Sequence, residues 1–270
     1  MSPVRAFTAF LATSVVLAGC GGSDHPRVNP EAMLDSAAQH PIRSADTDIE
    51  ARLRVDGAPR LSGPISLRLE GPYRSGGETK IPSFDWHVSA SALGFPVSGR
   101  LVSTGDNVYL TVYGKKYEVG AAAVADANAT LAEAGGLRLD VRSWLGPARV
   151  VGEYSAGGVD CERIAAPLRG GAVARDLTPL AEGLGASPPS VSGRAVACVA
   201  FDDRVLHELE LRARFGLAPA DGARLAGATA IHLVADVVLS DVGGSREISA
   251  PGGSFRPIQD LFLTLNDLAG

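Results

Sequence analysis

The stretch VLHELELRARF, Val205–Phe215, decides the fold. Its odd-numbered positions are mostly apolar, and its even-numbered positions from 208 onward are all charged. A period of two residues is typical of a β-strand with one buried face and one solvent face. The stretch therefore predicts a long amphipathic strand, and residues 194–201 predict its antiparallel partner across the turn Asp202-Asp203.

The same alternation recurs along most of the chain and predicts a sheet. Strands are predicted over 49–55, 65–70, 84–89, 97–104, 108–113, 117–119, 148–154, 159–168, 231–240 and 247–250. Many are joined by short glycine turns such as Gly105-Asp106-Asn107, which favours consecutive antiparallel strands. A sheet of about nine strands must curl, so we expect a strongly curved half-barrel.

Helices are predicted between groups of strands. Asn29 and Pro30 are typical of a cap and a first helical residue, and a short helix is expected to follow them. Further helical segments are predicted at 121–134, 143–145, 177–184 and 257–268. The expected fold class is α+β, with the helices covering the concave apolar face of the sheet.

The N-terminus has the layout of a secretory signal. Met1–Gly19 carries one basic residue and an apolar run too short to span a bilayer. Leu17-Ala18-Gly19-Cys20 matches the lipobox of bacterial lipoproteins, in which Cys20 receives diacylglycerol and then a further acyl chain such as palmitate. The alternative is an ordinary signal whose cleavage site happens to contain cysteine.

These features predict three parts. Residues 1–19 are a lipoprotein signal peptide, residues 20–29 form a flexible tether after the lipidated Cys20, and residues 30–270 form one domain. The expected location is the outer face of the cytoplasmic membrane or the cell envelope. The formal net charge of −5 and the scarcity of lysine exclude a nucleic-acid footprint.

No pattern in the sequence predicts catalysis or a metal site. The five histidines are scattered, and we expect no metal, no cofactor and no enzyme. His207 is interpreted as a hydrogen-bonded core residue, with ligand contact as the less common alternative. A hydrolase remains a weak alternative, because spacing yields no nucleophile, base and acid set.

Cys161 and Cys198 form an even pair in a chain that is expected to be exported. Both lie in predicted strands, in GVDCERI and AVACVAF, which could be neighbours. A disulfide across this span would stabilise the fold by about 4 kcal/mol on the chain-entropy model. Two buried free thiols are the alternative.

The chain as a whole resembles the LppX/LprG-type family of actinobacterial envelope lipoproteins, whose fold is related to the carrier LolA. The likeness is carried by LAGC at 17–20, NVYLTVYGKKYEVG at 107–120, WLGPARVVGEYSAGGVDCERIAAPL at 144–168, VACVAFDDRVLHELELRARF at 196–215 and ADVVLSDVGG at 235–244. The resemblance implies a half-barrel whose hydrophobic cavity binds acyl chains of lipids or lipoglycans and carries them within the envelope. The cysteine pair departs from the family pattern.

Inward residues of the predicted strands and of one covering helix are the candidates for the cavity wall. They are Leu67, Leu69, Trp86, Val88, Leu110, Leu177, Leu180, Leu184, Leu209, Leu211 and Val237. Each of them could instead pack a solid core. The competing function is a scaffold or interaction lipoprotein that has the same fold and no lipid cargo.

Overall fold

The computed structural model describes residues 29–58, 63–77, 79–92, 94–133, 142–156, 158–183, 190–224, 227–244 and 246–261. Cys20 and most of the tether therefore lie outside the described residues. The strands are β1 (Ser44–Asp56), β2 (Ile65–Arg74), β3 (Ser83–Ala92), β4 (Phe95–Thr104), β5 (Val108–Val112), β6 (Lys115–Glu118), β7 (Arg149–Ala156), β8 (Val159–Pro167), β9 (Ser190–Ala200), β10 (Leu206–Gly216), β11 (Ala230–Ser240) and β12 (Arg256–Pro257). The helices are α1 (Pro30–Gln39), α2 (Ala121–Glu133), α3 (Gly170–Gly183) and α4 (Pro219–Arg224).

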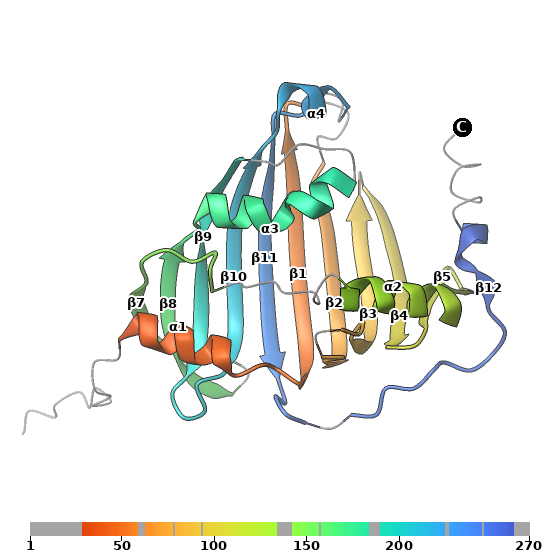
Figure 1. Ribbon diagram of the computed structural model, residues 1–270, viewed down its shortest axis with the longest axis horizontal. Helices are drawn as coiled ribbons and strands as arrows, with labels where there is room; N and C mark the ends of the chain where they lie inside the picture. The colour runs from red at the N-terminus through yellow and green to blue at the C-terminus, as the bar shows by residue number, and fades with distance from the viewer. Residues whose placement is uncertain are drawn as a thin grey trace, which may run out of the picture.

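The twelve strands form one curved, unclosed sheet in the order β12-β6-β5-β4-β3-β2-β1-β11-β10-β9-β8-β7. Two meanders make up its halves, β1–β6 and β7–β11, and antiparallel pairing of β1 with β11 joins them in the middle (Figure 1). Only β12, which pairs with β6, is parallel to its neighbour among the described strands. The predicted α+β half-barrel is confirmed, and the sheet is larger than the expected nine or so strands.

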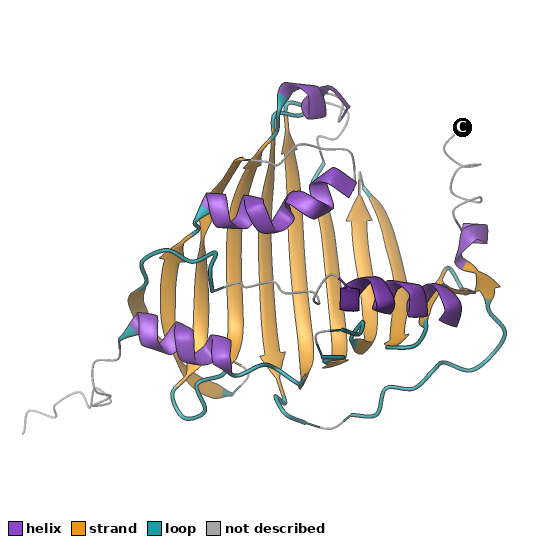
Figure 2. Ribbon diagram, viewed as in Figure 1, coloured by secondary structure: helices purple, strands orange, loops and turns teal. Residues whose placement is uncertain are grey.

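Helices α1, α2 and α3 lie over the same face of the sheet, which we call the inner face (Figure 2). The predicted start of α1 is confirmed, since the Asn29 side chain accepts hydrogen bonds from the N–H groups of Glu31 and Ala32 at 3.0 and 3.4 Å. Helix α3 starts against β9, where a Cβ on Gly170 would meet the Val191 carbonyl oxygen at 1.9 Å. Glycine at this position therefore allows the helix to approach the sheet closely.

The strand predicted at 247–250 is wrong. Residues 246–255 form no strand and lead instead to β12, on the far edge of the sheet. The physical reason is that both edges of β11 are already paired, one with β1 and the other with β10, so a hairpin partner after Gly243-Gly244 has no free edge.

Two further helical predictions fall on short segments. The short helical turn predicted at 143–145 is a hydrogen-bonded turn at 142–144, closed by the Leu145 N–H donating to the Arg142 carbonyl at 3.2 Å, and Leu145 itself pairs in an isolated bridge with Leu168. Residues 258–261 are helical, and the rest of the predicted C-terminal helix lies outside the described residues. Helix α4 was not predicted from the sequence, since its six residues are too few to show a helical period.

A tightly packed apolar cluster lies under α1. Met33 and Leu34 of the helix pack with Leu145 and with buried residues of the neighbouring strands, Ile164, Ala166, Ala195, Ala197 and Val199. Three of these strand residues are alanines, whose small side chains leave room for the helix to lie against β8 and β9. The cluster fixes α1 over this part of the sheet.

Candidate functional site

The middle of the inner face is apolar but only half-buried. One row of the sheet aligns Leu209, Val237, Ile49, Leu69 and Val88 on adjacent strands. All five are half-buried, in contrast to the cluster under α1, whose members are 5 % exposed or less. The helices therefore leave a strip of the apolar sheet surface incompletely covered.

The structure places eight of the eleven predicted cavity residues on β-strands. Leu67, Leu69, Trp86, Val88, Leu110, Leu209, Leu211 and Val237 belong to the register rows of the inner face, and each is half-buried. Leu177 and Leu180 lie within α3, but their side chains are outside what the structure describes. Leu184 lies outside the described residues altogether.

Trp86 covers a gap in the inner face. Its indole N–H donates to the Thr47 hydroxyl at 3.0 Å, and Gly71 of β2 lies between the two strands that carry them. The Trp86 ring also stacks on Phe84, with ring centroids 4.0 Å apart. Because Gly71 has no side chain, the indole reaches across β2 and supplies the apolar surface that this strand lacks there.

A large cavity opens at the rim of the half-barrel, and we call it the rim cavity. Its volume is about 850 Å³, within the range of about 300–1,000 Å³ typical of ligand pockets. Its lining residues are Pro41, Arg43, Tyr73, Arg74, Ser75, Gly76, Gly77, Lys80, Ile81, Pro82 and Leu131. Tyr73, Ile81, Pro82 and Leu131 give it an apolar wall, and Arg43, Arg74 and Lys80 give it basic groups.

A second cavity of about 210 Å³ lies under α1, and we call it the α1 cavity. Its lining is mostly apolar: Leu34, Ala37, Ala38, Pro41, Ile42, Leu145, Ala197, Leu206 and Leu209, with the polar residues His40 and Arg142. Pro41 lines both cavities, so they flank the segment that joins α1 to β1. Leu209 is the predicted wall residue that the structure brings to this cavity.

Arg142, which lines the α1 cavity, belongs to a three-residue clamp with Glu31 and Asp35. Arg142 forms ion pairs with Glu31 at 2.7 Å and with Asp35 at 2.6 Å, one turn apart on α1. Glu31 also accepts a hydrogen bond from the Ala148 N–H at 2.8 Å. The clamp joins α1 to the segment before β7.

Asn128 fixes α2 near the rim cavity. Its side-chain oxygen accepts from the Ile81 N–H at 2.8 Å, and its amide nitrogen donates to the Gly105 carbonyl at 3.0 Å. The amide therefore connects α2 to the β2–β3 loop and to the β4–β5 turn. Both ends of the amide are used, which gives the Asn-Ala-Thr sequence at 128–130 a structural role.

Sequence reasoning missed the residues of the rim cavity. Arg43 follows α1, Lys80 lies in the β2–β3 loop, and Leu131 lies near the end of α2. Long-range packing brings these segments together, and no local period marks them. The one available signal is that Lys80 is among only three lysines in the chain.

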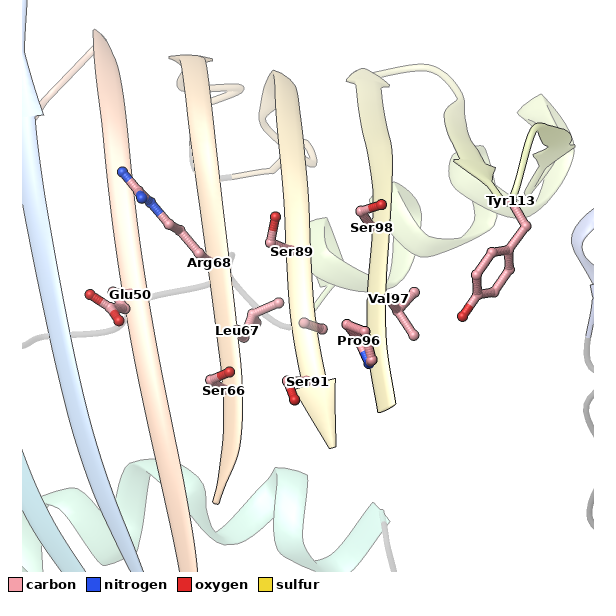
Figure 3. Close-up of a pocket in the computed structure, with 11 residues that line it drawn as sticks. Glu50, Ser66, Leu67, Arg68, Ser89, Ser91, Pro96, Val97, Ser98 and Tyr113 are labelled. Atoms are coloured by element: carbon pink, nitrogen blue, oxygen red, sulfur yellow. The ribbon is translucent and has the colours of Figure 1, made fainter. Parts of the chain in front are cut away.

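The opposite face of the sheet carries a polar groove, which we call the outer trough (Figure 3). Its volume is about 400 Å³, and its lining includes Ser66, Ser89, Ser91 and Ser98 between Glu50 and Arg68 on one side and Tyr113 on the other. Its arginine is already paired, since Arg68 binds Asp48 at 2.7 Å. The outer face is therefore polar and charged around this trough, in contrast to the apolar strip of the inner face.

The cysteine pair lies on adjacent strands. Cys161 of β8 and Cys198 of β9 have Cα atoms 5.5 Å apart, and the structure joins them as a disulfide. Both are fully buried beside Ala156.

His207 is 4 % exposed, and neither of its ring nitrogens has a hydrogen-bond partner among the described residues. The Asp203 carboxylate is the nearest charged group described for it, at 3.9 Å. The expected burial of His207 is confirmed, and the expected hydrogen bond is not found within the part of the chain that the structure describes.

Two carboxylates have shifted pKa values, and both are used in structural contacts. The Trp144 indole N–H donates to Asp176 at 2.8 Å and, with Arg175, lowers the pKa of that carboxyl. A hydrogen bond from His232 at 2.7 Å, together with Arg54, lowers the pKa of Asp56. Hydrogen bonding to the charged form is the main cause in each case.

The described residues contain no group of three or more potential metal ligands. None of the helices in that part of the chain is long and apolar enough to cross a bilayer. What the arrangement offers chemically is an apolar surface with two adjoining cavities, one of them rimmed by basic side chains.

Comparison with known proteins finds no matching family model and no matching curated relative. Among solved structures, the chain is similar to the lipoprotein LppX of Mycobacterium tuberculosis, with 12 % identity, a TM-score of 0.46, and coverage of 82 % of this chain and 98 % of that chain. It is similar to LprF of Mycobacterium bovis, with 12 % identity, a TM-score of 0.48 and coverage of 83 % and 97 %. It is also similar to a LolA superfamily protein of Nitrosomonas europaea, with 10 % identity, a TM-score of 0.27 and coverage of 80 % and 95 %. LppX, which gives its name to the family that the sequence resembles, is thus among the solved structures to which the chain is similar.

Proposed function

We propose that this chain is a lipid-anchored protein of the cell envelope that binds acyl chains of a lipid or lipoglycan and carries them, without catalysing a reaction. The observation that carries the proposal is the half-buried apolar strip of the inner face, with the rim and α1 cavities beside it. A chain of 16 carbons in water costs on the order of 12 kcal/mol, so moving a lipid between membranes requires an apolar enclosure of this kind.

The test is direct recovery of cargo. The mature chain carrying Cys20→Ser is purified from the export compartment, extracted with organic solvent and examined by mass spectrometry. We expect stoichiometric lipid to copurify. A lipid-free extract, together with failure to take up a fluorescent fatty acid, would contradict the proposal and favour a scaffold protein without lipid cargo.

Two neighbouring positions of β3 supply a matched pair of variants. Val88 is half-buried in the inner-face row, and Ser89 is exposed in the outer trough. Val88→Gln is expected to reduce fatty-acid binding several-fold, because it places a polar group on the apolar strip. Ser89→Gln is expected to leave binding unchanged, and thermal unfolding of both variants separates lost binding from lost folding.

Anchoring is tested separately. We expect Cys20 to hold the exported chain in the membrane fraction through its acyl chains. Mass spectrometry of the native membrane-bound chain should find acyl chains on Cys20, and Cys20→Ser should abolish them. A native exported chain whose Cys20 is unmodified would contradict lipidation at this position.

A further inference from the structure

We infer that the cargo of the rim cavity carries an anionic head group, received by Arg43, Arg74 and Lys80 at the mouth. This inference rests on the proposed function and adds the chemical class of the lipid. The lining of this cavity combines three exposed basic residues with the half-buried apolar residues Tyr73, Ile81, Pro82 and Leu131.

The positive charge around the rim cavity contrasts with the negative charge of the chain as a whole. The formal net charge of the whole sequence is −5, yet the described residues that line the rim cavity include three basic side chains and no acidic one. Glu78 belongs to the same loop by sequence and lies outside the described residues. The formal charge remains positive when Glu78 and the nearby Asp106 are both included.

The basic groups retain capacity to bind an anion. Lys80 has Asp106 at 3.8 Å, but both side chains are mostly exposed, 60 % and 80 %, so this pair is weak. Arg74 donates to the Arg246 carbonyl at 2.6 Å, which holds its guanidinium without neutralising it. Among the described residues, no hydrogen bond or ion pair involves the Arg43 side chain.

The wall of the cavity explains why the anion should belong to a lipid. Tyr73 lies on the inner face, in register with Ala45 and Phe84, and Leu131 of α2 lines the same cavity. An acyl chain on this wall would leave its head group among the three basic side chains. Arginine and lysine bind phosphate and carboxylate oxygens strongly, so a phospholipid or another acidic lipid fits better than a neutral glyceride.

The experiment compares two lipids that differ only in head-group charge. The mature chain with Cys20→Ser is mixed with vesicles of phosphatidylcholine or phosphatidylglycerol that have identical acyl chains, and the lipid retained by the reisolated protein is quantified. We expect retention of phosphatidylglycerol to exceed that of phosphatidylcholine by about tenfold at low salt and to fall as salt is added.

Matched variants locate the effect. Arg43→Gln with Lys80→Gln should remove the preference and leave retention of phosphatidylcholine unchanged. Lys115→Gln with Arg149→Gln removes the same charge from exposed positions elsewhere on the sheet and should keep the preference. Arg74 is left in place because it contacts the Arg246 carbonyl.

Each contrary result has one meaning. Equal retention of both lipids by the native chain overturns the anionic head group and leaves the proposed function standing. Retention of neither lipid overturns the proposed function as well. A preference that survives Arg43→Gln with Lys80→Gln overturns the assignment to the mouth. Tight calorimetric binding of inorganic phosphate to the lipid-free chain would instead identify a free-phosphate site.

Discussion

The indole of Trp86 donates to the hydroxyl of Thr47 from two strands away, at 3.0 Å, across Gly71. The same hydroxyl donates to the Gly71 carbonyl at 2.9 Å, so the two hydrogen bonds join three strands at one point of the inner face. Thr47 is 5 % exposed, which makes the hydrogen bonds costly to lose.

Thr47→Val should destabilise the protein by about 1–3 kcal/mol, because it leaves the Trp86 N–H without its acceptor while conserving shape. Urea unfolding followed by tryptophan fluorescence measures the change. Thr111→Val on β5 makes the same chemical change where no side-chain hydrogen bond is described, and it should cost less than about 0.5 kcal/mol. Equal effects at the two positions would contradict the role of the Trp86 contact.

Gly71→Ala should be more damaging than its size suggests. Gly71 has a φ of +143°, and an added Cβ would meet the Asp85 carbonyl oxygen at 2.1 Å. We expect a loss of at least about 1–3 kcal/mol, measured by thermal unfolding. Gly252→Ala is the control, since open space surrounds that position. A stable Gly71→Ala protein would show that β2 can shift away from β3 at little cost.

The disulfide between Cys161 and Cys198 is predicted to form in the exported protein. Thiol titration of the denatured chain carrying Cys20→Ser should find no free thiol before reduction. Reduction should lower the free energy of unfolding by about 4 kcal/mol, because the bridge closes a 37-residue span. Two free thiols in protein recovered from the export compartment would contradict the bridge.

Asp176 predicts a pH dependence with a definite sign. The Trp144 hydrogen bond, and Arg175 after it, lower the folded-state pKa of Asp176, so this contact stabilises the fold fully above the unfolded pKa of about 3.9. The stabilisation is lost as the pH falls through the lower folded-state pKa.

The chain contains two tryptophans, Trp86 and Trp144, so replacing Trp86 leaves the fluorescence of Trp144 alone. In a Trp86→Phe background, Trp144 emission should change with a midpoint below about pH 3.9. Asp176→Asn in the same background should remove that transition, and circular dichroism identifies any global unfolding. A midpoint at or above about pH 4 would contradict the shifted carboxyl.

Much of the fold could be predicted because its strands are amphipathic. The stretch 205–215 has one polar face and one apolar face. The strand predicted there matches β10 (Leu206–Gly216) to within one residue at each end. The N-cap at Asn29 could also be predicted from neighbouring residues, because the accepting side chain and the N–H groups that donate to it lie within three residues of each other. Local patterns of this kind carry their own structural signal.

The remaining features depend on contacts between distant segments. The error at 247–250 arose because the sequence does not reveal that β11 is flanked by β1 and β10. The rim cavity was missed for the same reason, because Arg43, Lys80 and Leu131 belong to three separate segments. The predicted wall residues share the inner face, but which of them contact a ligand stays a prediction.

The pairing of β1 with β11 also determines when the half-barrel can be completed. Ile49 lies opposite Val237, so nearly the whole chain must be synthesised before this central ladder can form. Until then the first meander has a long open edge at β1. The entropy cost of closing the long loop between β1 and β11 is compensated only when these two strands pair. The N-terminal half must therefore remain unaggregated, with its main hydrogen-bonding edge exposed, until β11, the last long strand of the sheet, has been made.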